Sequence, residues 1–107
     1  MNIIEKLQKK GITLDYKQIQ AICQKYYIQE FSVFGSSLRE DFNEQSDIDI
    51  LVSFRENADI TLFDIIDLEN ELTIILERKA DVVEKESLKN PIRKKNILET
   101  REIIYAA

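Results

Sequence analysis

Two aspartates, Asp47 and Asp49, stand two residues apart at the start of an apolar stretch. In an extended strand such residues point to the same face, about 6 to 7 Å apart along the chain. Two neighbouring carboxylates repel each other unless a cation lies between them, and hard oxygen ligands of this kind suit Mg²⁺ or Mn²⁺. Taken alone, the tripeptide favours a simpler interpretation, in which Asp47 caps a turn and Asp49 faces solvent. The neighbouring residues therefore carry the argument.

Gly35 and Ser36 follow a predicted strand and begin the segment GSSLRED. Backbone N–H groups and the Ser36 hydroxyl could bind phosphate oxygens there, because glycine lets a ligand approach the backbone closely. Arg39 could reach the same phosphate. A Gly-Ser pair after a strand is usually only a turn. A phosphate-binding turn beside a carboxylate pair, however, is what a metal–nucleotide site requires.

Asp81 supplies a third acid, at the start of the short β-branched segment ADVV. If that strand neighbours the strand of Asp49, its carboxylate could complete a metal site or accept a proton from an attacking hydroxyl. The alternative is that Asp81 merely ends a turn. Three acids and a phosphate-binding turn predict in-line transfer at a nucleotide phosphorus, in which positioning and charge do most of the work.

The elements that must position these residues alternate between helical and strand periods, which indicates an α/β or α+β domain. In chain order we expect a short helix that Gly11 ends, a helix from Thr13 or Asp15 to about Tyr26, a strand over 28–34, a strand over 47–54, a helix from Asp59 or Thr61 to Glu77, a strand over 80–84, and a final helix from Asn90-Pro91 to about Tyr105.

Composition excludes several classes of function. The chain has no histidine and one cysteine, Cys23, so His-based triads, disulfides and multi-cysteine metal sites are excluded within this chain, and we expect Cys23 on the buried face of a helix. The net charge of −5 does not favour bulk nucleic-acid or anionic-lipid binding. With no membrane-spanning apolar run and no signal-peptide core, 107 residues are expected to form one cytoplasmic domain, residues 1–107.

Gly35-Ser36, ten intervening residues and Asp47-Ile48-Asp49 resemble the GSx10DxD signature of the polymerase β-type nucleotidyltransferase superfamily. The flanking segments VFGSSLRE and SDIDILVSF are similar to those of its minimal, single-domain members. The resemblance implies the α+β nucleotidyltransferase fold, a small mixed sheet flanked by helices. It also implies that Asp47, Asp49 and Asp81 are catalytic and bind Mg²⁺, with two ions expected, and that Gly35, Ser36 and Arg39 bind the triphosphate of ATP.

Minimal nucleotidyltransferases of this size are often paired with HEPN ribonucleases in toxin–antitoxin systems, and members transfer AMP to a tyrosine of the HEPN protein. The resemblance therefore implies an antitoxin that modifies and neutralises a HEPN toxin, since HEPN ribonucleases depend on a histidine motif that this chain lacks. The sequence departs from the family pattern at Glu40, where many relatives have glycine, which predicts a less flexible loop and a more acidic approach for phosphate.

Two other functions stay open at this point. The chain could be a catalytically silent antitoxin that acts by binding and occlusion, or a transferase acting on a small molecule or an RNA end. Base preference, acceptor and stoichiometry are not readable from the residues. Basic residues at the start of the last helix, Lys89, Arg93, Lys94 and Lys95, could contact nucleotide or an acidic partner, or simply be solvated. Apolar residues beyond one small core, on the helix over 61–77 and among Ile103, Ile104 and Tyr105, predict a hetero-oligomer or homodimer.

Overall fold

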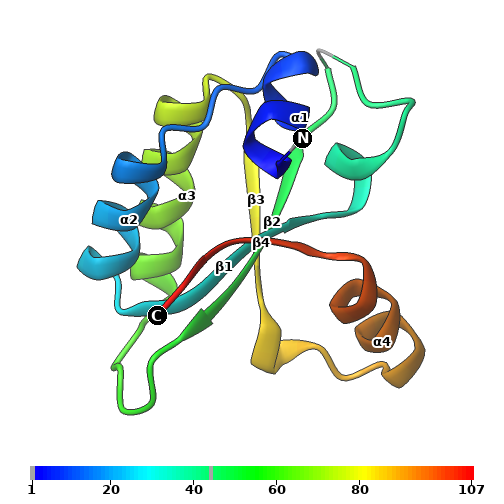
Figure 1. Cartoon of the computed structure of the whole chain (residues 1–107). Helices are drawn as coiled ribbons and strands as arrows, with labels where there is room; N and C mark the ends of the chain where they lie inside the picture. The colour runs from blue at the N-terminus through cyan, green and yellow to red at the C-terminus, as the bar shows by residue number, and fades with distance from the viewer. Residues whose placement is uncertain (1, 44) are drawn as a thin grey trace.

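The computed structural model describes residues 2–43 and 45–107, and its elements follow one another from the N-terminus to the C-terminus as coloured in Figure 1. They are α1 (Ile3–Lys9), α2 (Tyr16–Lys25), β1 (Ile28–Phe34), the 3₁₀ turn η1 (Gly35–Leu38), β2 (Ile48–Phe54), α3 (Leu62–Leu76), β3 (Ala80–Glu84), the 3₁₀ turn η2 (Lys85–Ser87), α4 (Pro91–Thr100) and β4 (Glu102–Ala106).

The four strands form one mixed sheet in the order β3-β2-β1-β4. β1 pairs antiparallel with both β2 and β4, while β2 and β3 are parallel. The parallel pair is joined by α3, as expected for a crossover connection. The C-terminal end of β1 and the N-terminal ends of β2 and β3 therefore meet at the same end of the sheet, where the predicted site residues lie.

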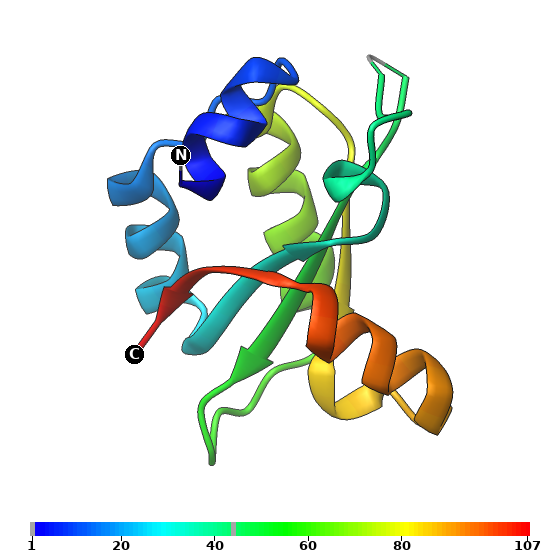
Figure 2. The ribbon, with the colours of Figure 1, turned by 45° about the vertical axis from the view of Figure 1, so that its right-hand side comes forward.

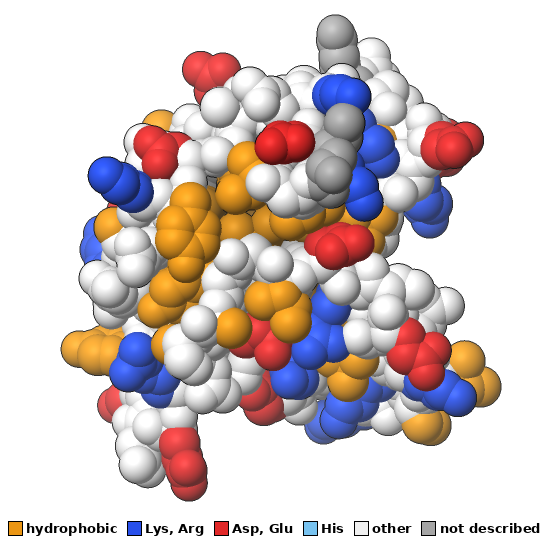
Figure 3. Space-filling view, in the orientation of Figure 1, with side chains coloured by type: hydrophobic (Ala, Val, Ile, Leu, Met, Phe, Trp, Pro, Cys, Tyr) orange, Lys and Arg blue, Asp and Glu red, His pale blue; other side chains and the backbone are white. Residues whose placement is uncertain are grey.

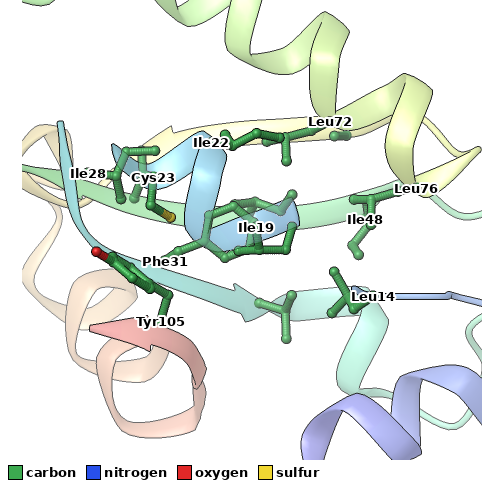
Figure 4. Packing of buried hydrophobic residues seen from close by; sticks show 14 of the residues in the cluster. Leu14, Ile19, Ile22, Cys23, Ile28, Phe31, Ile48, Leu72, Leu76 and Tyr105 are labelled. Carbon is green, nitrogen blue, oxygen red and sulfur yellow. The ribbon is translucent and has the colours of Figure 1, made fainter. Parts of the chain in front are cut away.

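The two faces of the sheet carry separate apolar clusters. On one face, side chains of β1 and β2 pack against α1, α2 and α3, and Figure 4 shows Phe31 and Ile48 beside Ile19, Cys23 and Leu72. On the other face, Phe34 and Leu51 pack with Leu88 and with Ile97 of α4. Figure 2 shows α4 set apart from the three other helices. Alternate residues of β2 thus serve different cores, and Asp49 shares the α4 face with Leu51.

Local signals in the sequence set the starts of α2, α3 and α4 as predicted. The Asp15 side chain caps α2, Thr61 and Asp64 form a capping box at the start of α3, and the Asn90 side chain accepts from two backbone N–H groups at the start of α4. Cys23 is fully buried on α2, as expected. The mixed α+β architecture predicted from the sequence is confirmed.

The prediction of a final helix reaching Tyr105 is wrong. α4 ends at Thr100, Arg101 is extended (φ −62°, ψ 149°), and the chain continues as the edge strand β4. Tyr105 pairs with Phe31 and is buried, while Ile103 is about half exposed. β-Branched and aromatic residues favour a strand when an unpaired strand edge is available, and β1 provides that edge.

The outer surface of α3 exposes apolar side chains, among them Leu62, Phe63 and Ile74. These residues belong to the helix in which the sequence predicts a contact surface, and the assembly state of the chain stays a prediction. Among residues 2–43 and 45–107, no helix combines the length and apolar character needed to cross a bilayer.

Candidate nucleotide-transfer site

Gly35 forms the turn at which β1 passes into η1. Its φ of +67° lies in the left-handed region, and a Cβ built at this position would be only 2.6 Å from Oδ2 of Asp49. Both facts require glycine, since an L side chain strains that backbone and would displace the carboxylate. The glycine of the first motif and an aspartate of the second are therefore in direct contact.

Ser36 binds the two motifs together through its backbone N–H and its hydroxyl. Its backbone N–H donates to Asp49 Oδ2 at 3.3 Å, and its hydroxyl is 3.2 Å from the same oxygen. The hydroxyl is also 3.1 Å from the backbone carbonyl oxygen of Asp47. The Ser36 donors that the sequence predicts for phosphate thus converge on a carboxylate oxygen of Asp49.

Asp47 lies just before β2, with a side chain that is 47% exposed and 3.9 Å from Nζ of Lys79. Asp81 is the in-register neighbour of Asp49 across the parallel β2–β3 pair, so both point to the α4 face of the sheet. Within the described part of the chain, however, no three acidic or cysteine side chains are grouped closely enough to hold a metal ion. The structure brings Asp49 and Asp81 together, and the three-acid site stays a prediction.

Arg39 follows η1, and its exposed guanidinium is 3.5 Å from a carboxylate oxygen of Asp41. The adjoining Glu40 is an exposed turn residue with no positive φ, so its side chain causes no backbone strain at a position where the family pattern predicts glycine. Glu40 also lies outside the pocket residues next to Gly35. The departure at Glu40 therefore leaves the contact between Gly35 and Asp49 unaffected.

Two pockets adjoin Gly35. One, of about 640 Å³, lies between α1, η1 and α4 and is lined by Arg39, Asn96 and Thr100, together with lysines of the α1 segment. The other, of about 480 Å³, lies along α4 and is lined by Arg93 and again by Asn96 and Thr100. Of the α4 residues, sequence analysis singled out Arg93 but missed Asn96 and Thr100, because polar residues on a short helix give no signal of their own.

The loop that joins the two motifs is held by residues that the sequence analysis also missed. Nζ of Lys10 donates to the carbonyl oxygens of Ser37 and Arg39 at 3.1 and 2.9 Å. Arg78 donates to the carbonyls of Asn43 and Ser46, and its guanidinium carbon lies 4.6 Å from the centroid of the Phe42 ring. These contacts join segments about thirty residues apart, and no local pattern predicts them.

A half-buried ion network lies further along the α4 face. Glu30 of β1 accepts a hydrogen bond from Arg101 Nε at 2.9 Å and is 3.5 Å from Nζ of Lys85. Burial alone raises the pKa of Glu30, but the hydrogen bond and charge of Arg101, with Lys85, hold that pKa below its ordinary value. The network links β1 to Arg101, which joins α4 to β4, and so helps to fix the position of α4 relative to the sheet.

The mixed sheet carries a glycine-serine turn bonded to the aspartate of a DxD strand, which is the arrangement that the sequence predicts for nucleotide transfer. The nucleotidyltransferase domain family matches residues 15–104, and the chain belongs to that family. The protein adenylyltransferase MntA of Thermococcus cleftensis is 39% identical over 82 residues, which cover 77% of this chain and 78% of MntA. The predicted family and enzyme class are therefore confirmed.

Solved structures share the fold at lower sequence identity. A toxin–antitoxin complex with AMP-PNP contains a chain that superposes with a TM-score of 0.69 at 19% identity, covering 88% of this chain and 75% of that one. A complex of a tri-AMPylated HEPN toxin with its MNT antitoxin from Shewanella oneidensis gives a TM-score of 0.61 at 18% identity, covering 86% and 70%.

Proposed function

We propose that this protein transfers AMP from ATP to a hydroxyl group of a partner protein, and that the partner is a HEPN toxin that it thereby neutralises. The name of the MntA relative supports protein adenylylation, and the AMPylated HEPN toxin bound to an MNT antitoxin of the same fold supports the partner class. The AMP-PNP complex supports ATP as the donor.

The contact of Ser36 with Asp49 is the observation that carries the proposal. Two donors of one residue converge on a single oxygen of the DxD pair, directly above a glycine whose missing Cβ leaves room for it. An anion-binding turn and an acid for a cation are therefore coupled at one point. A turn with only a structural role needs neither the close approach of Gly35 to Asp49 nor Asp81 on the same face of the sheet as Asp49.

The reaction assigns a task to each residue. The acceptor hydroxyl oxygen attacks the α-phosphorus of ATP, a new P–O bond forms, and the bond to the β-phosphate breaks. Pyrophosphate leaves with the electron pair of that bond, while the hydroxyl proton passes to the carboxylate of Asp81. The Ser36 N–H and hydroxyl, which donate to Asp49 in the structure, would turn to phosphate oxygens when the Asp49 carboxylate holds the cation. The Gly35 N–H would bind the same phosphate, and Arg39 adds positive charge beside it.

The donor set fits a divalent cation. Asp47 and Asp49 offer hard carboxylate oxygens, and Mg²⁺ is usually held by one or two carboxylates together with substrate phosphates rather than by a cage of protein ligands. A site without three grouped acids is consistent with that mode of binding. Asp47 and Asp49 would hold the metal, which when bound would offset the negative charge of the phosphates, and Asp81 beside Asp49 stays available to accept the proton.

The test is adenylylation of the cognate partner by an Asp47→Ala/Asp49→Ala variant. With ATP and Mg²⁺, the native chain should add the mass of one or more AMP groups to the partner, and the partner should stay inactive after separation. The double variant should lose transfer by at least about 10³-fold, because it lacks both metal ligands. An Asp59→Ala/Asp67→Ala variant removes the same charge from exposed positions and should transfer normally.

Two outcomes contradict the proposal. Full neutralisation of the toxin by the Asp47→Ala/Asp49→Ala variant, with no mass change in any mixture, would establish the silent antitoxin that acts by occlusion. AMP transfer to a small molecule or an RNA end, with the partner protein unmodified, would establish the other class of acceptor. Circular dichroism of both variants checks that the fold is retained.

A further inference from the structure

We propose that α1 supplies a phosphate-binding wall that extends the site: Lys6 and Lys9, together with Arg39, bind the β- and γ-phosphates of the nucleotide and then the leaving pyrophosphate. The inference rests on the proposed nucleotide transfer and adds residues to it. The family match begins at residue 15, so α1 lies outside the part of the chain that the family defines.

The pocket of about 640 Å³ places these cations beside the phosphate-binding turn. Gly35 and Ser37 line one side of it, and Lys6 and Lys9 line the α1 side. Lys6 and Lys9 are three residues apart on the helix and so share one face. Figure 3 shows Lys and Arg side chains gathered over α1 and the chain beyond β1, above the hollow that separates them from α4.

The charge of this pocket is opposite to that of the molecule. The chain as a whole carries −5, yet the described residues that line the pocket include four cationic side chains, from Lys6, Lys9, Lys10 and Arg39, and one carboxylate, that of Glu102. A concave site with an excess of one charge raises the local concentration of ligands of the other sign. A triphosphate, with several negative charges on a short chain, is the part of a nucleotide that such a pocket selects.

Lys10 fixes α1 against the turn. Its ammonium donates to two backbone carbonyls of the η1 segment, those of Ser37 and Arg39, so the end of α1 is tied to the residues that follow Gly35. Lys10 is therefore a positioning residue, and Lys6 and Lys9, both exposed, keep their ammonium groups available for ligand. Basic residues near the end of a helix also interact favourably with its dipole. That effect does not explain why Lys6, Lys9 and Arg39 surround the same pocket.

The expected role is strongest at the end of the reaction. As the bond between the α- and β-phosphates breaks, negative charge develops on the pyrophosphate oxygens. Ammonium groups within reach of those oxygens stabilise that charge more than they stabilise the bound triphosphate. Removing Lys6 and Lys9 should therefore weaken binding of the polyphosphate group and slow transfer, without changing affinity for the nucleoside monophosphate.

The test compares ligands that differ only in their phosphates. Isothermal titration of the full chain with AMP-PNP, AMP and inorganic tripolyphosphate should show that Lys6→Gln/Lys9→Gln weakens AMP-PNP and tripolyphosphate binding by about tenfold or more. Affinity for AMP should stay within about twofold, since we expect its single phosphate to contact Gly35 and Ser36 and not α1. The matched control, Lys17→Gln/Arg55→Gln, removes two exposed charges outside this pocket and should bind all three ligands as the native chain does.

The remaining outcomes overturn the inference. If the variant loses the same affinity for AMP as for AMP-PNP, the lysines bind the nucleoside or stabilise the fold. If its affinity for AMP-PNP is unchanged, they have no role in binding. If the control variant loses as much affinity for AMP-PNP and tripolyphosphate, the change in net charge alone explains the effect. Failure of the native chain to bind tripolyphosphate, with AMP-PNP bound normally and indifferent to the variant, would also contradict it. Loss of AMP transfer in the Asp47/Asp49 variant tests the proposed function separately.

Discussion

Gly35 and Gly11 both have a positive φ, but only Gly35 lies against a site residue, so alanine substitutions at the two positions separate backbone strain from damage to the site. Gly35→Ala forces a Cβ to within 2.6 Å of Asp49 Oδ2, whereas Gly11→Ala meets no atom closer than 3.9 Å, and both glycines have positive φ. We expect each variant to lose about 1 to 2 kcal/mol of unfolding free energy from the left-handed backbone. Only Gly35→Ala should also abolish AMP transfer, because its methyl group displaces the aspartate.

Urea unfolding and an adenylylation assay on both variants check this prediction. Normal transfer by Gly35→Ala would show that the contact with Asp49 is dispensable, and loss of transfer by Gly11→Ala would show that backbone strain alone explains the effect.

Glu30 determines part of the acid sensitivity of the fold. Arg101 and Lys85 outweigh the effect of burial, so the pKa of Glu30 in the folded chain is below its ordinary value of 4.5. Such a group stabilises the fold above the unfolded pKa, and this stabilisation is lost as the pH falls through the folded pKa. Between about pH 5 and pH 3, the unfolding free energy of the native chain should therefore fall more steeply than that of Glu30→Gln.

Chemical denaturation at a series of pH values measures both slopes. Glu99→Gln, an exposed substitution on α4, serves as the control and should follow the native curve. Parallel curves for the native chain and Glu30→Gln would show that the ion network contributes no proton linkage.

At the scale of elements, β4 is an edge strand of the sheet, and it contributes Tyr105 to the apolar cluster that packs against α1, α2 and α3. Tyr105 on β4 is 7% exposed and pairs with Phe31, and its ring centroid lies 6.5 Å from that of Tyr16. Tyr105→Ala should lower the unfolding free energy by about 3 kcal/mol, because it leaves a cavity between α2 and the sheet. Ile103→Ala, on the same strand but 46% exposed, should cost less than about 1 kcal/mol.

Denaturant titration of the two variants measures this difference. Similar losses for Tyr105→Ala and Ile103→Ala would contradict the packing of β4, since a helical C-terminus would not place these two side chains in such different environments.

At the scale of the whole molecule, Cys23 reports on global unfolding. The thiol is fully buried on α2, and burial raises its pKa from 9.0 to about 12, so it stays protonated near neutral pH. A thiol-alkylating reagent, which reacts with the thiolate, should therefore label Cys23 only in molecules in which unfolding has exposed it. ATP with Mg²⁺ should slow labelling in proportion to site occupancy, because a ligand that binds only the folded chain lowers the unfolded population.

Labelling followed by mass spectrometry measures the rate with and without nucleotide. The Asp47→Ala/Asp49→Ala variant should lose the protection by nucleotide while keeping the slow basal rate. Rapid labelling of the native chain without denaturant would show that α2 opens locally.

The sequence by itself determined the parts of this protein that depend on neighbours along the chain. Capping residues such as Asp15 and Thr61 set the ends of helices, and alternating apolar residues set β1 and β2, because both effects act within a few residues. The motif residues Gly35, Ser36 and Asp49 were likewise identified from type and spacing. The turn at Gly35 and the alternation along β2 are local properties, but the antiparallel pairing of β1 with β2, which sets Phe34 opposite Asp49, brings the two motifs together.

Only the tertiary structure decided what depends on segments distant in sequence. Residues 102–106 became a strand because β1 offered an unpaired edge, and the sequence after Pro91 alone predicted a longer helix. Lys6 and Lys9 line the same pocket as Gly35, and Lys10 beside them binds carbonyl groups 27 and 29 residues away. Pairing of this kind is chosen by the packing of the whole sheet and its helices, and no local pattern of residue types encodes which distant backbone group a side chain will meet.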